Sequence, residues 1–194
     1  MTNSWVVADP HFGHLGVCKF LHPNGVDALR PWDTPEEMDE ALVKNWNEVV
    51  RPADRVNLLG DVVINRRCLV TLGRLNGRIR LVKGNHDIFK LADYLPYVDD
   101  IVAYHVTKGQ QGGKVIMSHI PIHPESLGRF GVNIHGHLHA HFVTKTTQHK
   151  SELESWTETV ADRRYVCVSV EQTNWRPITL EEALARAEPT DESD

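Results

Sequence analysis

The chain has 194 residues, of which 41% are hydrophobic and 24% are charged, and these values are typical of a globular protein with a substantial buried core. Its formal net charge of -5 argues against a broad surface for duplex nucleic acid, although it leaves room for a small basic site. The sequence has no long apolar run and no basic, apolar leader, so we expect a cytoplasmic protein that crosses no membrane. The three cysteines have no paired spacing, which fits a reducing compartment. The composition does not indicate an oligomeric state.

Short apolar runs that lead into polar loops recur five times along the chain. These strand-and-loop segments cover residues 4–11, 54–61, 78–87, 113–119 and 131–137. The apolar parts are short and rich in β-branched residues, as expected for buried strands. Because binding sites of α/β proteins assemble at the carboxyl ends of strands, the polar residues at these ends are candidates for function.

Capping signals predict where helices begin. Thr34 and Glu37 have the spacing of a capping box, and the apolar residues over 34–50 repeat with helical periodicity. A second helix is expected over 65–75, where the following Asn-Gly pair would end it. A final helix is expected to begin at Thr179, which has a glutamate three residues later.

The rest of the chain is expected to add one excursion, one strand and one tail. Residues 142–164 are polar and predict a long loop or hairpin, and an apolar run within 163–172 returns as a strand. The acidic residues 188–194 are expected to be disordered. With no internal repeat, residues 1–187 are expected to form a single domain.

Five polar motifs follow the expected strands in chain order, namely DPH, GD, GNHD, SH and GHLH. They supply Asp9, His11, Asp61, Asn85, His86, Asp87, His119, His137 and His139. Each motif is common when it occurs alone, but the ordered set is specific. It resembles the pattern of the calcineurin-like metallophosphoesterase superfamily, and the match runs from Asp9 to His139, about two thirds of the chain.

This resemblance implies a fold and a set of metal ligands. The expected fold is α/β, a four-layer α/β/β/α sandwich of two mixed sheets flanked by helices. One divalent metal ion would be held by Asp9, His11, Asp61 and His139, and the other by Asp61, Asn85, His119 and His137. Imidazole nitrogens and carboxylate oxygens suit Mn²⁺, which we favour, and also Fe, Ni²⁺ or Zn²⁺. Two metals about 3.5–4 Å apart need a ligand with two oxygens, which makes Asp61 the natural bridge.

The resemblance also implies a metal-dependent phosphoric ester hydrolase similar to small bacterial and phage-type members. Metal-bound hydroxide would attack phosphorus in line, His86 would protonate the leaving oxygen, and Asp87 would orient His86. The expected substrate is a phosphodiester, first a 2′,3′-cyclic or other small nucleotide. The alternatives are a phosphomonoesterase, a nuclease acting on oligonucleotides and, as the least favoured, a binding scaffold without catalysis.

Three further residues are candidates for contact with the substrate. His14 lies one turn beyond His11 and could face the phosphate, or it could be an ordered loop histidine bonded to a carboxylate. His123 could also touch substrate, and Arg129 could grip a phosphate, although a solvated loop arginine is the alternative. Nearby aromatic side chains could stack a base, but the core is the expected place for each of them. These aromatics are Phe12, Phe20, Trp32 and Phe130.

The stretch HGHLHAH carries a histidine at every second position from 135 to 141. On a strand, His137 and His139 would lie about 7 Å apart, and we expect them to converge on neighbouring metals. We expect His135 to be a buried support beside the site and His141 to be peripheral.

Overall fold

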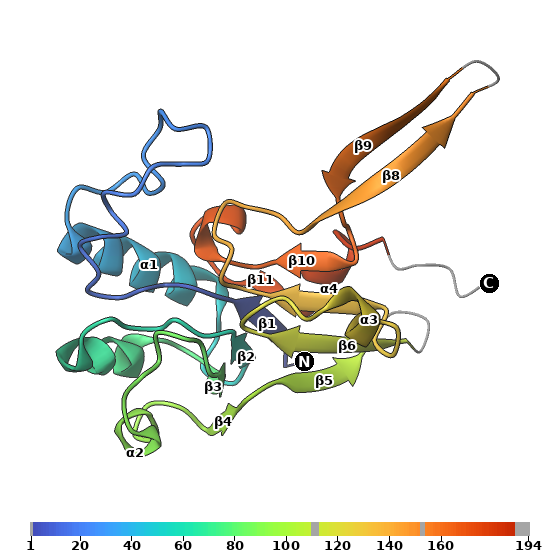
Figure 1. Cartoon of the computed structure of the whole chain (residues 1–194). Helices are drawn as coiled ribbons and strands as arrows, with labels where there is room; N and C mark the ends of the chain where they lie inside the picture. The colour runs from blue at the N-terminus through green and yellow to red at the C-terminus, as the bar shows by residue number, and fades with distance from the viewer. Residues whose placement is uncertain (1, 110–112, 152–153, 189–194) are drawn as a thin grey trace.

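Two mixed β-sheets form the centre of the fold (Figure 1), and the computed structural model describes residues 2–109, 113–151 and 154–188. The five-stranded sheet comprises β1 (Ser4–Val7), β2 (Arg55–Leu58), β3 (Arg78–Val82), β4 (Asp100–Val102) and β11 (Ile178–Thr179), in the order β11-β1-β2-β3-β4. The four-stranded sheet comprises β5 (His105–Lys108), β6 (Lys114–Ser118), β7 (Val132–His135) and β10 (Tyr165–Cys167), in the order β10-β7-β6-β5. Both sheets are mixed because β11 and β5 run antiparallel to otherwise parallel neighbours. The predicted α/β class with two mixed sheets is therefore confirmed.

Helical segments are few and mostly short. They are α1 (Pro35–Val49), the 3₁₀ helix η1 (Arg66–Arg74), α2 (Leu91–Tyr94), α3 (Pro124–Leu127), the 3₁₀ helix η3 (Val170–Gln172) and α4 (Leu180–Leu184). As predicted, Thr34 caps α1 by accepting the backbone N–H of Glu37, and Thr179 begins α4 with a complete capping box. The second predicted helix is present as a 3₁₀ helix. No described helix is long and apolar enough to cross a membrane.

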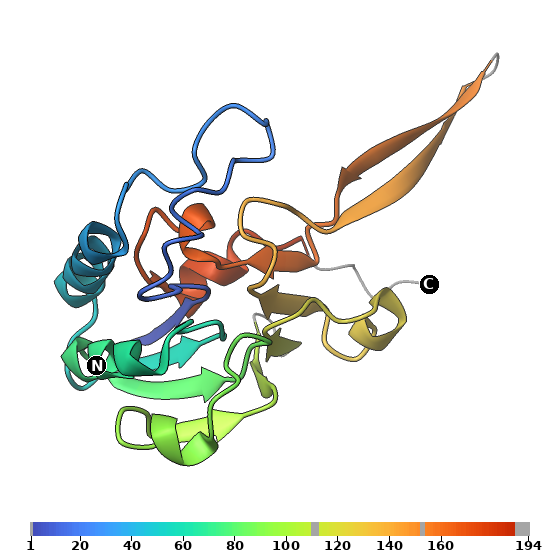
Figure 2. The same ribbon diagram turned by 60° about the vertical axis from the view of Figure 1, so that its left-hand side comes forward.

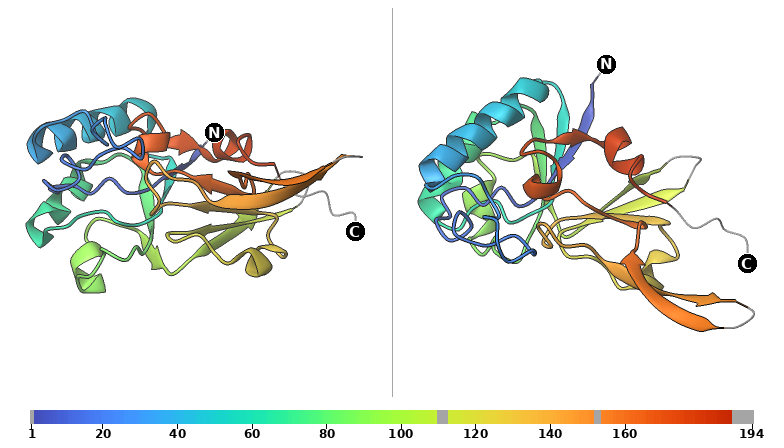
Figure 3. Two further views of the ribbon diagram at one scale, coloured as in Figure 1. Left: turned by 45° about the horizontal axis from the view of Figure 1, so that its top comes forward. Right: turned by 90° about the horizontal axis from the view of Figure 1, so that it is seen from above.

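Two apolar cores hold these layers together. In the first, α1 and η1 pack on the face of the five-stranded sheet that points away from the other sheet (Figure 3). The predicted apolar face of α1 is buried there through Met38, Leu42 and Trp46. The second core lies between the sheets and unites side chains of β1 with those of β6, β7 and β10. Cys167 is buried, as expected for a small core residue.

The excursion predicted over 142–164 is a hairpin of β8 (Thr144–Lys150) and β9 (Ser155–Ala161), which pair antiparallel. The hairpin projects away from the two sheets (Figures 1 and 2). The predicted acidic tail lies outside the described residues from position 189 onward. The strands β4, β5 and β11 were not predicted, because each is short or half exposed and lacks a long apolar run.

Candidate metal centre

The candidate ligands follow strands of both sheets and gather at one end of the sandwich. Within the described part of the chain, they form two groups, Asp9 with His11 and His139, and Asp61 with His119 and His137. In each group the possible ligand atoms lie within 4.8 Å of one another. Six of the seven predicted ligands are therefore placed so that they could hold two metal ions.

Left-handed backbone conformations are concentrated at these ligands. The φ angles are 58° at Asp9, 51° at His11, 53° at Asp61, 70° at His137 and 52° at His139. Only two other non-glycine residues in the described chain have a positive φ. Such conformations are unfavourable for residues with a Cβ and persist where the surrounding structure enforces them, commonly at functional sites. The backbone turns thus aim successive ligands inward at the ends of the strands.

The prediction that His137 and His139 lie on a strand is wrong. β7 ends at His135, and both later histidines occupy a turn with positive φ. Their alternate spacing therefore does not reflect strand periodicity. His135 is buried as expected, its Nδ1 lies 2.7 Å from the carbonyl oxygen of Gly136, and burial lowers its pKa to about 4. His141 is exposed and belongs to neither group of possible ligands.

Two glycines allow the ligand loops to approach each other. A Cβ on Gly136 would lie 2.6 Å from Oδ2 of Asp9, and one on Gly84 would lie 2.3 Å from Oδ1 of Asp61. Real Cβ atoms do not come so close to other atoms, so any side chain here would push a candidate ligand away. Glycine is therefore needed at positions 84 and 136, because the backbone there comes into close contact with the carboxylates of Asp61 and Asp9.

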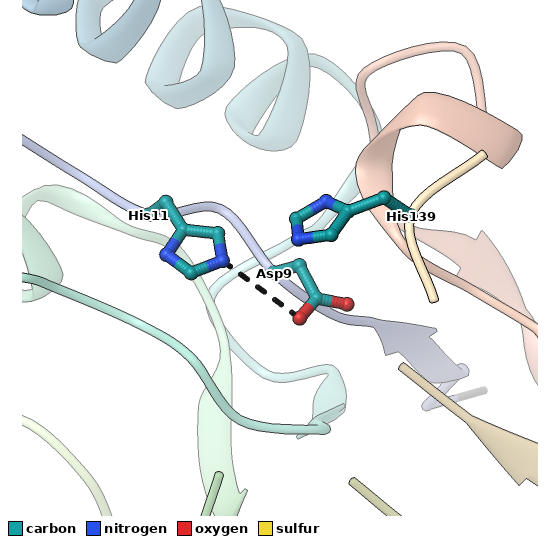
Figure 4. A group of neighbouring side chains, drawn as sticks. All are labelled: Asp9, His11 and His139. Carbon is teal, nitrogen blue, oxygen red and sulfur yellow. Dashed lines mark ion pairs between the residues drawn. The ribbon is translucent and has the colours of Figure 1, made fainter. Parts of the chain in front are cut away.

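The first group contains a buried carboxylate oxygen that lacks a partner. Oδ2 of Asp9 accepts hydrogen bonds from the backbone N–H of His137 at 2.9 Å and the hydroxyl of Ser169 at 2.6 Å. Oδ1 has no hydrogen-bond partner among the described residues and lies 4.0 Å from Nε2 of His11 (Figure 4). This separation is too long for a hydrogen bond, but it lets two ligands share one ion with bonds of about 2.0–2.2 Å. Burial raises the pKa of Asp9 to about 6, and a bound cation would offset that effect.

The second group has acceptor atoms that face each other. Nδ1 of His119 lies 2.8 Å from the carbonyl oxygen of Leu59, so this nitrogen carries the proton and donates it. The other ring nitrogen, Nε2, lies 2.8 Å from Oδ1 of Asn85 and 3.4 Å from Oδ1 of Asp61. A neutral imidazole would point a lone pair at these oxygens. A second proton on His119, a metal ion, or an Asn85 amide turned to present its NH₂ group would each satisfy the contact.

Asp61 belongs to the second group and also faces the first. One of its oxygens faces His119, and the other, Oδ2, lies 3.7 Å from Nε2 of His11. Although burial acts to raise the pKa of Asp61, the neighbouring His119 and His86 lower it below its ordinary value. A carboxylate that presents one oxygen to each group is the geometry expected of a bridging ligand.

Two residues that no sequence motif marks, Arg30 and Glu171, support the first group. Oε1 of Glu171 lies 3.0 Å from Nδ1 of His139 and 2.8 Å from Nε of Arg30. Arg30 also donates to the carbonyl oxygens of Asp9 at 2.6 Å and Pro10 at 2.7 Å. Glu171 would fix the tautomer of His139 and leave its Nε2 free for a metal. No motif marks this pair, because 141 positions separate its members.

His86 and His14 lie beside the centre without joining either group. The His86 ring is exposed and sits edge-on to His11, with 5.6 Å between ring centroids. The His14 ring is 5.4 Å from His11 and half-buried, and burial together with Arg30 lowers its pKa. Phe20 packs edge-on against His14 and is 50% exposed, so the expectation that it lies in the core is wrong.

The predicted role of Asp87 needs correction. Its buried carboxylate accepts backbone N–H groups of Asp61 at 2.9 Å, Val62 at 3.0 Å and Gly84 at 2.8 Å. In the described residues no hydrogen bond joins Asp87 to the ring of His86. Both oxygens of Asp87 are already used, so it binds the GD and GNHD loops to each other instead of orienting His86.

His123 and Arg129 lie outside the two ligand groups. Nδ1 of His123 accepts the backbone N–H of Glu125 and caps α3, which accounts for its position in the loop. Arg129 is exposed in the turn after α3. Neither residue belongs to a ligand group, and their contact with a substrate stays a prediction.

The fold and the ligand groups define an α/β protein with side chains placed to hold two metal ions. The chain is similar to the Uncharacterized protein MJ1445 of Methanocaldococcus jannaschii, at 30% identity over 189 residues that cover 93% of this chain and 89% of that protein. The chain belongs to the same family as this archaeal protein.

Two other similarities were found. The Gene 66 protein of Mycobacterium phage L5 is 34% identical over 92 residues, which cover 45% of this chain and 41% of the phage protein. The crystal structure of the Protein of Unknown Function AQ665 from Aquifex aeolicus aligns with a TM-score of 0.63 and 23% identity, covering 94% of this chain and 97% of that one, which indicates a shared fold. No family model matches the chain.

Proposed function

We propose that this protein is a dimetal phosphodiesterase of the calcineurin-like metallophosphoesterase superfamily. The observation that carries the proposal is the position of Asp61, whose two oxygens face His11 in one group and His119 in the other. Mixed nitrogen and oxygen ligands around two adjoining positions suit borderline divalent ions such as Mn²⁺. When bound, such ions would activate water and stabilise the charge that develops on a transferring phosphoryl group.

The residues of the chain would divide the remaining work. Asp9 and Asp61 are the carboxylates of the two ligand groups, so two divalent ions would leave the centre positive and attractive to a phosphate. His86 is exposed beside His11, where it could deliver a proton to a leaving oxygen without being a ligand. Glu171 would orient His139 by a hydrogen bond, and Arg30 would hold both Glu171 and the backbone of Asp9.

A small nucleotide-type diester, such as a 2′,3′-cyclic nucleotide, is the proposed substrate. The exposed ring of Phe20 packs on His14, which itself packs on His11, so a base could stack there while its phosphate reaches the centre. The net charge of -5 does not favour a long nucleic-acid strand.

The decisive experiment measures hydrolysis of a bis-aryl phosphodiester with and without Mn²⁺, together with the number of metal ions bound. We expect two ions per chain and metal-dependent turnover that Asp61→Ala abolishes. His86→Ala should keep both ions but lose turnover by about 10²-fold or more. His141→Ala is the matched control that should retain activity, because His141 is exposed and belongs to neither ligand group.

Full activity in the presence of a chelator would refute the proposal. Loss of metal in His86→Ala would refute its role as a proton donor. A panel of cyclic nucleotides, phosphomonoesters and oligonucleotides then separates the diesterase from the monoesterase and nuclease alternatives.

A further inference from the structure

A cavity lies far from the ligand loops, where the strands of the five-stranded sheet begin. This cavity of about 370 Å³ opens between the two sheets. The starts of β1, β2 and β3 form one wall, and His105, Thr107 and Met117 form the other. Because the candidate ligands follow the opposite ends of β1, β2 and β3, the cavity is separate from the metal centre.

Cross-strand rows explain why this end of the inner face is polar. Ser4 pairs with Arg55 and Arg55 pairs with Arg78, and two positions further on Asn57 pairs with Arg80. Alternate residues of a strand face the same side, so all five side chains project from the sheet toward the cavity that they line. Further along the same strands, this face becomes the apolar core between the sheets. The arginines therefore occupy a place that elsewhere in the sandwich is filled by aliphatic residues.

The positive charge in the cavity is only partly balanced. Nε of Arg78 lies 3.3 Å from Asp99, and Nε of Arg80 lies 2.9 Å from Asp100. The carboxylates are about half exposed, at 46% and 45%, and they engage only the Nε side of each guanidinium. Among the described residues Arg55 has no ion-pair partner. Three guanidinium groups thus face two carboxylates, and neighbouring like charges in a row destabilise a sheet.

His105 leaves this excess charge in place. Its Nε2 lies 2.9 Å from Nη1 of Arg80, and since a guanidinium can only donate, the imidazole accepts and is neutral. Burial, together with Arg80, lowers the pKa of His105. The side chains of Ser4, Asn57 and Thr107 add neutral hydrogen-bonding groups to the same walls.

We propose that this cavity is a binding site for a small phosphate-class anion, held by the guanidinium groups of Arg55, Arg78 and Arg80. Planar guanidinium groups match phosphate oxygens in pairs. Among the described residues, the carboxylates leave the Nη atoms of Arg78 and Nη2 of Arg80 without a hydrogen bond, whereas Nη1 of Arg80 contacts His105. The volume is within the range of small-ligand pockets, so free phosphate or the phosphate of a small metabolite would fit. A bound dianion would also relieve the repulsion between the paired arginines.

The test is titration of the full-length, metal-free protein with inorganic phosphate and pyrophosphate by calorimetry, with chloride at equal ionic strength as the blank. We expect saturable binding that weakens about tenfold or more in Arg55→Gln, because a charge-assisted contact is lost. The double variant Arg55→Gln/Arg80→Gln should not bind. The control is Arg74→Gln. Arg74 is an exposed arginine at the end of η1 that pairs with Glu40 of α1, away from the cavity.

Amide chemical shifts locate the bound anion. Phosphate should shift the amides of β2, β3 and β5 and leave those of the GNHD and GHLH loops unchanged. The proposal is overturned if the wild type shows no saturable binding, if Arg74→Gln weakens binding as much as Arg55→Gln, or if the shifts map to the metal centre. Failure here would leave the proposed hydrolysis untouched, because that activity depends on other residues.

Discussion

Glu171 offers the sharpest test of how the candidate centre is organised. Its side chain is 3% exposed and accepts hydrogen bonds from His139 and from the fully buried Arg30. Although burial acts to raise the pKa of Glu171, Arg30 and His139 lower it, so the group is an anion at neutral pH. Glu171→Gln removes the charge while it keeps the size and one acceptor oxygen.

The expected effects follow from this burial. Removal of one partner of a buried ion pair leaves an uncompensated charge, which costs about 3–5 kcal/mol; a retained amide oxygen favours the lower end. For a chain of this size, ~3 kcal/mol lowers the melting temperature by roughly 6–12 °C. Loss of the residue that orients a ligand histidine should weaken metal binding by about 10–100-fold. Only the ion held by Asp9, His11 and His139 should be affected.

The assay combines thermal unfolding of the metal-free protein with Mn²⁺ titration against a competing chelator. Wild type should bind two ions, and Glu171→Gln should bind one with unchanged affinity and one more weakly. Glu40→Gln is the matched control, because it removes the partner of Arg74 in an exposed ion pair and should cost less than about 1 kcal/mol.

A double variant separates stability from positioning. Glu171→Leu with Arg30→Met removes both buried charges, so part of the stability should return while the weak metal affinity remains. The return is only partial because the carbonyl oxygens of Asp9 and Pro10 lose the hydrogen bonds that Arg30 donates. Unchanged metal affinity in Glu171→Gln, or equal weakening of both ions, would refute the positioning role of Glu171.

Three further predictions concern the ligand loops. In the metal-free protein, burial raises the pKa of Asp9 from 3.8 to about 6, so stability is lost as the pH rises from 3.8 through 6. Asp9→Asn should therefore raise the free energy of unfolding by up to about 3 kcal/mol at pH 7.5 and by much less at pH 4. Equal gains at the two pH values in urea titrations would contradict this. Asp87→Asn should cost about 1–3 kcal/mol of stability, because its amide NH₂ group would face the backbone N–H of Val62, donor against donor. An unchanged free energy of unfolding with only a shifted pH profile of activity would instead favour a role through His86. Gly136→Ala should lose metal from the first group and about 1–3 kcal/mol of stability, because the new Cβ would collide with Asp9. Gly128→Ala should match wild type, because no described atom beyond its chain neighbours lies within 4 Å of a Cβ at that position. Retention of both ions by Gly136→Ala would contradict the expected loss of metal.

Local patterns in the sequence were sufficient to predict many of the elements. The capping residues Thr34 and Thr179 begin helices as expected, because a cap and its partner lie within one turn of each other. The two mixed sheets were expected from the resemblance to a known superfamily. The segment 65–75 also folds as a helical element, although it forms a 3₁₀ helix.

Predictions that extended a local pattern too far were wrong. Alternation in HGHLHAH predicted strand residues, but positive φ at His137 and His139 makes this stretch a turn. Asp87 follows His86 in sequence, yet its carboxylate faces the backbone of Asp61 and Val62. Neighbours along the chain are poor guides to partners where the backbone reverses direction.

The sequence by itself determined which side chains are available as metal ligands and that they follow strands. The division of these ligands into two groups, with Asp61 reaching both, was expected from the resemblance, and the geometry agrees with it. The tertiary structure alone decided which buried residues support the groups. The pairing of Arg30 with Glu171 and the arginine row at the opposite end of the sheet both depend on contacts between distant segments. Such contacts leave no periodic signal in the chain, because they arise only when the strands take their places in the sheets.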